Sequence, residues 1–211
     1  MGRVNYNYKD RYLLTVSARY DGSSRLAPGH KWVLFPSAAL AWRVKEESFL
    51  KDVDCLSNLK LRLGWGITGN TAIDPYKTQG NLEYGRYSYG SNGVLAFYQK
   101  EMPNPNLSWE KTEQWNAGID FGFLNGRIGG SVDLYLQNTN DLLMDRQLPI
   151  VSGFGNVTTN IGQIRNKGLE VTLNTVNIDT KDFKWTTDFM FSVNKEEIVE
   201  LYNGKVDEEG N

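Results

Sequence analysis

The feature that most constrains the fold of this chain is a regular alternation of apolar and polar residues. The segment 169–174 reads LEVTLN, in which every second residue is apolar. Successive side chains of a β-strand point to opposite faces, so this pattern predicts a strand whose two faces differ in chemistry. The same alternation returns in the segments 12–20, 32–44, 59–68, 114–123, 127–137 and 184–193. The sequence therefore predicts an all-β fold.

The length and the polar faces of these runs indicate where such strands would lie. Many of the runs reach about 9–11 residues, the length of a tilted strand that crosses a membrane, whereas soluble strands most often have about 5–6. Their polar faces carry Arg, Lys, Asp, Gln and several Gly residues. Such residues suit a wide wet barrel better than a narrow packed interior. The sequence predicts an antiparallel transmembrane β-barrel segment, with one face toward lipid and the other toward the lumen.

The connections between the runs are short at one end and long at the other. Asn125-Gly126 predicts a tight type I′ hairpin turn, and the segment 177–182 predicts a short polar turn. The segments 69–111 and 139–160 are long connections at the opposite end. Short periplasmic turns and long extracellular loops are typical of outer-membrane barrels. The segment 45–57 is the exception, because it lies on the short side but has room for a helical turn.

The chain contains no run of about 18 apolar residues, so the sequence predicts no transmembrane helix. This does not exclude a membrane protein, because transmembrane strands are short and alternate. The N-terminal residues MGRVNYNYKDRY lack the apolar core of a secretory signal. If the protein is exported, we therefore expect this chain to lack its natural beginning.

Charge and composition exclude several classes of site. The formal net charge of −2 gives no basic surface of the kind that nucleic-acid-binding proteins carry. Cys55 is the only cysteine and His30 the only histidine. A cysteine cluster or a histidine pair for a metal therefore cannot form, and His30 is predicted to lie on the surface. We expect no nucleic-acid partner, no metal and no cofactor.

The sequence also lacks the pattern of an enzyme. Asp120, Asp133 and Asp188 lie on polar strand faces, and no nucleophile–base motif accompanies them. We interpret them as residues of a polar wall. The residues GWGITGN (64–70) contain Gly-x-Gly, but no helical pattern follows, so a dinucleotide site is not predicted. We expect no enzymatic activity.

The best candidates for binding lie in the long connections. The segment 81–90, NLEYGRYSYG, combines aromatic rings with a guanidinium, which could contact a glycan or a peptide. The residues concerned are Tyr84, Arg86, Tyr87 and Tyr89. The alternative is a loop that packs on its neighbours or on a partner lipoprotein. The second long connection adds two weaker candidates, Arg146 and Phe154.

Five separated blocks of the sequence, in this order, resemble the SusC/RagA family of TonB-dependent outer-membrane transporters of Bacteroidota. The blocks are RYDGSSRLAPGHKW (19–32), FPSAALAWRVKEESFL (35–50), LKLRLGWGITGN (59–70), NPNLSWEKTEQWNAGIDF (104–121) and NIGQIRNKGLEVTL (160–173). The resemblance covers nearly the whole chain. It is specific because the five blocks match together, whereas one block such as YDGSSR would carry little weight.

The resemblance implies that residues 1–211 form a β-barrel domain fragment, about seven or eight strands of a barrel of about 22. No signal peptide, plug or TonB box is matched in this chain. The alternation then places Leu134, Leu173 and Phe191 toward lipid. It places five polar residues toward the lumen. These are Arg62, Asp120, Asp133, Glu170 and Asp188.

The function implied by the resemblance is part of an importer for oligosaccharides or peptides in the outer membrane of a Gram-negative, Bacteroidota-like cell. The implied partners are a SusD-like lipoprotein lid, TonB acting through parts not matched here, the substrate, and outer-membrane lipid. The alternative from the residues alone is a soluble or surface-attached β-sandwich that binds carbohydrate through the Tyr-rich loop. The run lengths and the one-sided long loops favour the barrel.

Overall fold

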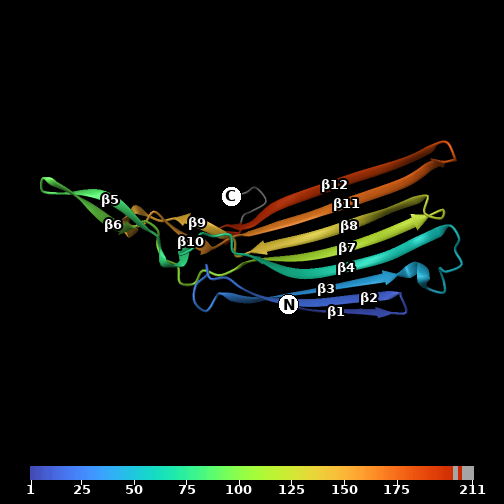
Figure 1. Cartoon of the computed structure of the whole chain (residues 1–211), viewed down its shortest axis with the longest axis horizontal. Coiled ribbons are helices and arrows are strands. Elements are labelled where there is room, and N and C mark those ends of the chain that lie inside the picture. Colours follow the sequence, from blue (N-terminus) through green and yellow to red (C-terminus); the bar gives the residue numbers. More distant parts are fainter. Residues whose placement is uncertain (202–203, 206–211) are drawn as a thin grey trace.

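The computed structural model describes residues 1–201 and 204–205, and its main element is one antiparallel sheet (Figure 1). The sheet has nine strands in the order β1-β2-β3-β4-β7-β8-β11-β12-β13. The strands are β1 (Gly2–Tyr8), β2 (Tyr12–Gly22), β3 (Trp32–Arg43), β4 (Leu56–Asn70), β7 (Glu110–Phe123), β8 (Ile128–Asn140), β11 (Gln163–Asp179), β12 (Lys184–Leu201) and the two-residue β13 (Gly204–Lys205). The expected all-β antiparallel architecture is confirmed.

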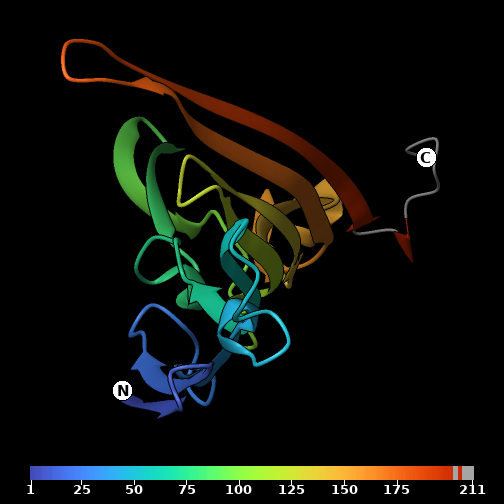
Figure 2. The ribbon, with the colours of Figure 1, turned by 90° about the vertical axis from the view of Figure 1, so that its right-hand side faces the viewer.

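The sheet is long, twisted and curved, and it stands alone. β11 and β12 have 17 and 18 residues, well above the strand length usual in soluble proteins. Seen along the strands, the sheet bends rather than lying flat (Figure 2). A β-sandwich requires a second sheet about 10 Å away on the apolar face. In the part of the chain that the structure describes, no such layer covers it, and this contradicts the sandwich alternative.

Tight turns join the strands at one end of the sheet. In the β7–β8 turn, Leu124, Asn125 and Gly126 have φ angles of 53°, 55° and 82°. The Gly126 N–H donates to Phe123 O, and the Arg127 N–H donates to Leu124 O. The predicted Asn125-Gly126 turn is therefore present, and a second left-handed turn centred on Leu124-Asn125 overlaps it.

The long connections lie together at the opposite end of the sheet (Figure 1). This one-sided arrangement confirms the expected asymmetry. The long connections are not irregular loops, however, because each contains its own antiparallel pair. The pairs are β5 (Leu82–Tyr89) with β6 (Asn92–Gln99), and β9 (Leu143–Gln147) with β10 (Asn156–Asn160). Short 3₁₀ turns are η1 (Val44–Glu46), η2 (Lys77–Gln79) and η3 (Ile150–Ser152), of which η1 lies at the start of the predicted helical turn.

Two strand assignments differ from the sequence expectation. β1 was not predicted, although Val4, Tyr6 and Tyr8 alternate with polar residues and carried the signal. The turn predicted at 177–182 lies later, between the ends of β11 and β12. A register shift between Val176 and Ile178 lets β11 continue to its end at Asp179. A bulge of this kind adds a residue to one strand without breaking the ladder.

Burial is concentrated where the long connections meet the sheet. Leu26 and Leu107 are almost fully buried there, at 1% and 0% exposure. With Phe35, Ile73 and Trp109 they form a hydrophobic cluster. Most large apolar side chains of the sheet remain exposed instead. No helix among the described residues is long and apolar enough to span a bilayer.

Candidate functional site: a polar sheet face and an aromatic hairpin

The strand register places the predicted lumen residues on one face of the sheet. Gly118 lies opposite both Arg62 and Asp133, and Asp133 lies opposite Glu170. Residues directly opposite each other in a ladder project to the same face, as do residues two apart in one strand. Asp120 therefore shares this face with Arg62, Asp133 and Glu170.

Asp188 completes the set on β12. It lies opposite Asn174, which is four residues beyond Glu170 in β11 and so shares its face. Asn174 Nδ2 donates to Asp188 Oδ1 at 2.6 Å. No hydrogen bond or ion pair of Glu170 occurs among the described residues. The five residues thus share one face, but they do not form a single cluster.

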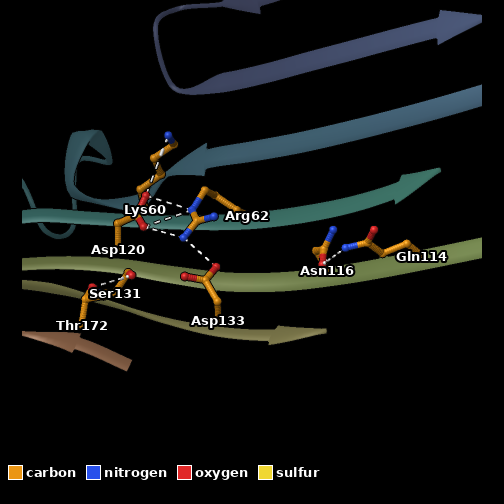
Figure 3. A network of polar contacts seen from close by, with 8 residues as sticks. All are labelled: Lys60, Arg62, Gln114, Asn116, Asp120, Ser131, Asp133 and Thr172. Atoms are coloured by element: carbon orange, nitrogen blue, oxygen red, sulfur yellow. Dashed lines mark hydrogen bonds and ion pairs between the residues drawn. The ribbon is translucent and has the colours of Figure 1, made fainter. Parts of the chain in front are cut away.

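Arg62 is the centre of the polar network drawn in Figure 3. Its Nε lies 3.0 Å from both carboxylate oxygens of Asp120, and its Nη2 lies 2.7 Å from Asp120 Oδ1. The same Nη2 lies 2.8 Å from Asp133 Oδ1. Lys60 adds a weaker contact, with its Nζ 3.9 Å from Asp120 Oδ2. One guanidinium therefore joins carboxylates from two neighbouring strands.

Gly118 makes this bridge possible. A Cβ atom at Gly118 would lie 2.3 Å from Asp133 Oδ1 and 2.8 Å from Arg62 Nη2. The guanidinium crosses the sheet directly above this residue, because Gly118 stands between Arg62 and Asp133 in the register. Only a residue without a side chain leaves that path open. In the sequence, Gly118 appears only as a small residue on the polar face of a strand. The alternation gives no sign that it leaves room for the bridge between Arg62 and Asp133.

Hydroxyl and amide groups extend the polar face on either side of Arg62. Ser131 and Thr172, on β8 and β11, share a hydroxyl–hydroxyl bond of 2.9 Å. Gln114 Nε2 donates to Asn116 Oδ1 at 3.1 Å on β7. Both pairs are visible in Figure 3. The face offers paired charges and many hydrogen-bonding groups to a polar solute. Among its described residues, no nucleophile lies in contact with a base.

The opposite face of the same strands is apolar and uncovered. Leu134 is 54% exposed and Phe191 is 47% exposed. Leu173 lies on that face as well, because it is two residues from Val171, which lies opposite Phe191. Soluble monomers rarely expose a continuous apolar surface of more than a few hundred Å². A face built this way requires an apolar environment such as lipid.

The four predicted binding residues of the hairpin β5–β6 do not converge on one surface. Tyr84 lies opposite Phe97, and Arg86 lies opposite Leu95, so both are on one face. Tyr87 and Tyr89 alternate with them and lie on the other. The three tyrosines are 71%, 62% and 76% exposed. The hairpin therefore presents aromatic surface on both faces, and the described residues do not pack over it.

The second pair of candidates lies near β9–β10. Arg146 is half-buried in β9, opposite Val157 of β10. Phe154 is half-buried after η3. The tip of this connection carries two residues that were not predicted, Ile150 and Val151, which are 94% and 97% exposed. Apolar side chains this exposed at a tip are the feature that sequence reasoning missed, because both read as ordinary loop residues.

The two long connections are joined to each other. Lys77 Nζ lies 2.7 Å from Glu101 Oε1 and 3.9 Å from Asp145 Oδ2. Burial opposes the charge on Lys77, but the hydrogen bond to Glu101 and the charges of Asp145 and Glu101 outweigh it and raise the pKa of Lys77. The Met102 N–H also donates to Asn156 O at 2.9 Å. The connections between β4 and β7 and between β8 and β11 thus form one assembly.

A second carboxylate joins elements at the short-turn end. Glu47 Oε1 accepts hydrogen bonds from the Tyr12 hydroxyl at 2.8 Å and from the Trp42 indole at 3.1 Å. Its Oε2 accepts from Arg11 Nη1 at 3.0 Å. These donors, Tyr12 first, lower the pKa of Glu47. Glu47 therefore holds the connection after β3 against the start of β2.

Comparisons with known proteins place this geometry in context. All of the chain, residues 1–211, matches the model of the family described as TonB dependent receptor-like, beta-barrel. The chain is 46% identical to the TonB-dependent receptor SusC of Bacteroides thetaiotaomicron, over 96% of this chain and 21% of that protein. It is 40% identical to the TonB-dependent receptor P26 of Formosa agariphila, over 95% of this chain and 20% of that protein.

The fold is also similar to solved structures. The structure of the RagAB peptide transporter matches with a TM-score of 0.85 and 31% sequence identity, over 97% of this chain and 22% of that chain. The RagAB peptide importer in its open-open state matches with a TM-score of 0.85 and 30% identity. The chain therefore spans about a fifth of the length of the relatives that it matches.

Proposed function

This chain belongs to the family of TonB-dependent receptor-like β-barrels, and from this premise we propose that it forms part of the wall of an outer-membrane importer for oligosaccharides or peptides. TonB-dependent receptors are transporters of the Gram-negative outer membrane, so the chain's place is in that membrane. The single observation that carries the proposal is the sheet with one face that is apolar over most of its length and one charged face. Such a sheet separates lipid from a wet lumen.

The polar face supports a role as lumen lining. Its charges compensate each other, since Arg62 joins Asp120 and Asp133. Compensated charges and paired hydroxyl groups can contact passing sugars or peptide groups without holding them tightly. Asp188 and Glu170 continue the same face toward β12. We assign these residues to the wall that a substrate passes, not to a site of chemistry.

The hairpin β5–β6 supports a role in contact with a partner. Isolated two-stranded hairpins are at best marginally stable in water. This one exposes Tyr84 and Phe97 on one face and Tyr87 and Tyr98 on the other. Burial of both faces requires a partner on each side, which favours a folded protein over a ligand that covers one face. We assign the hairpin to docking of a SusD-like lipoprotein lid, with substrate contact as the alternative.

The first test asks where the complete receptor resides. Cells that express the full receptor containing this segment are separated into aqueous and detergent-soluble outer-membrane fractions. The proposal expects recovery in the outer-membrane fraction and uptake of oligosaccharide or peptide that depends on TonB. Recovery in the aqueous fraction would contradict it.

The second test separates a lid from a substrate at the hairpin. Tyr84→Ala changes one face, and the double variant Tyr87→Ala/Tyr89→Ala changes the other. A lid that encloses the hairpin is weakened by both variants, by about 0.5–1.5 kcal/mol for each lost ring pair. A glycan or peptide on one face responds to one variant alone. Copurification of the lid and substrate titration are measured for each variant. If neither variant changes either quantity, the hairpin has no binding role.

A further inference from the structure

The outward apolar face becomes basic on β11 and β12 close to the long-loop end. A row of residues that lie opposite one another crosses the sheet there. The row contains Trp65, Trp115, Leu136, Lys167 and Lys195. Because each pair is directly opposite, all five project to the same face as Leu134 and Leu169. The row is therefore aromatic at one end and cationic at the other.

The next row toward the long connections adds a third cation. Arg165 lies between Asn138 and Glu197, and its Nε donates to Asn138 Oδ1 at 2.9 Å. In these two rows, the carboxylate that β11 and β12 contribute is that of Glu197. Lys167 and Lys195 form no ion pair within residues 1–201 and 204–205. On β11 and β12, three cations thus stand against one carboxylate. The other carboxylate in these rows, Glu113 of β7, lies on the far side of Asn138 from Arg165.

The next row on this face, one step farther from the long connections than the lysines, is fully apolar. It contains Leu134, Leu169 and Val193 in successive opposite pairs. Tryptophan in line with lysine, directly beside such an apolar band, is the composition of a membrane–water interface. Trp65 and Trp115 both donate an indole N–H to Glu113 Oε1, at 2.8 and 3.2 Å, as expected of rings whose polar edge faces water. This level therefore corresponds to lipid headgroups.

Lys167 and Lys195 are directly opposite each other, where like charges destabilise a strand pair. Long cationic side chains at this depth extend toward the interface, but extension alone leaves their mutual repulsion in place. An anion held between them removes that repulsion. A phosphate group has enough oxygens to accept from both ammonium groups and from the free N–H groups of Arg165.

We propose that Lys167, Lys195 and Arg165 form a binding site for the phosphate group of an anionic lipid in the outer leaflet. The acyl chains of that lipid lie along Leu134, Leu169 and Val193. The inference rests on the proposed function, because that function places the long-loop end in the outer leaflet. It goes beyond that function because it assigns a lipid site on the outside of the wall.

The test uses the complete receptor, purified in a mild detergent and titrated with three probes. The probes are phosphate-bearing lipid A, the same lipid after dephosphorylation, and inorganic phosphate. Bound lipid is counted by native mass spectrometry. The proposal expects the phosphorylated lipid to bind more tightly than the dephosphorylated lipid, and inorganic phosphate not to bind alone. Lys167→Gln/Lys195→Gln should weaken binding of the phosphorylated lipid by roughly 10- to 30-fold and leave the dephosphorylated lipid unchanged.

The same strands supply a matched control. Lys181→Gln/Lys184→Gln removes one lysine from the β11–β12 connection and one from the first position of β12, at the short-turn end of these strands. This variant should bind the phosphorylated lipid as the wild type does. Equal losses in both double variants, equal affinity for phosphorylated and dephosphorylated lipid, or binding of inorganic phosphate alone would each overturn the proposal. Recovery in the outer-membrane fraction is scored in parallel, so failure of the lipid site is distinguished from failure of the membrane assignment.

Discussion

Arg62 and Asp120 lie diagonally across β4 and β7, and the guanidinium contacts both oxygens of the carboxylate at 2.7 to 3.0 Å. This two-point geometry uses the planar fork of arginine, which lysine cannot reproduce. Nη2 remains able to reach Asp133 on β8 at 2.8 Å. One side chain therefore ties three consecutive strands of the wall together across its polar face.

Gly118→Ala is expected to break the contact between Arg62 and Asp133 while leaving the strands in place. The added Cβ would meet the flexible ends of those two side chains, not backbone. Because Arg62 is about a third exposed, the loss in unfolding free energy should be only about 1 kcal/mol. Chemical denaturation of the complete receptor in detergent measures it.

Gly64→Ala is the control for this prediction. Gly64 lies on the same face, and the nearest atom to its added Cβ is Asn116 Cβ at 3.8 Å. We expect no loss of stability there. In an Asp133→Asn background the cost of Gly118→Ala should shrink, since the charged contact is already absent. Equal costs for Gly64→Ala and Gly118→Ala would show that the bridge contributes nothing.

Leu173→Arg and Thr172→Arg test which face meets lipid. Arginine on the lipid face near mid-membrane costs about 2–4 kcal/mol, whereas a lumen position tolerates it. Thr172→Arg also removes the hydroxyl bond to Ser131, a cost that Leu173→Arg does not carry. The difference between the two variants therefore understates the cost of an arginine that faces lipid. We expect Leu173→Arg to lower the amount of folded receptor in the outer membrane more than Thr172→Arg does. Equal amounts for the two variants would contradict the assignment of faces.

Lys77→Met is expected to loosen the two long connections from each other. Lys77 Nζ lies 3.9 Å from Asp145 of the other connection, and this contact is lost with the cation. Lys77 and Glu101 are only 13% and 14% exposed, so the same change also leaves a largely buried carboxylate without its partner. Local opening should become easier by about 1–3 kcal/mol. Hydrogen exchange at the Met102 and Gly155 amides reports this directly, because both donate across the junction, to Asn156 O and Lys100 O.

Lys100→Met provides the comparison for the junction. Its ion pair with Glu83 is far more exposed, at 59% and 42%. Exposed pairs contribute little, so we expect almost no change in exchange at the same amides. If Lys100→Met accelerates exchange as much as Lys77→Met, the contacts of Lys77 are not what joins the connections.

Glu47 is expected to make the short-turn end sensitive to acid. Hydrogen bonds from Tyr12 and Trp42 hold the folded-state pKa of Glu47 below its ordinary value of 4.5. Stability from this group is therefore present above that ordinary value and is lost as the pH falls through the lower folded-state pKa. Unfolding temperature measured from about pH 6 to pH 3 should fall less steeply in Glu47→Gln than in the wild type. An unchanged slope would show that Glu47 does not contribute.

Much of the fold followed from the sequence because alternation is a local property. A period of two residues assigns each side chain to one of two faces without knowledge of its neighbours. For this reason Leu134, Leu173 and Phe191 were separated correctly from Asp133 and Glu170. The lengths of the runs and the presence of long connections at one end could also be predicted from the sequence. β1 carried the same signal in Val4, Tyr6 and Tyr8.

The tertiary structure alone decided which residues meet. Arg62 and Asp120 are separated by 58 residues, and strand register, set by pairing across the whole sheet, brings them together over Gly118. The same holds for Lys77 and Glu101, which become neighbours only because the long connections fold into paired strands. Local periodicity fixes the face on which a side chain lies, whereas contact depends on register, which is a non-local property.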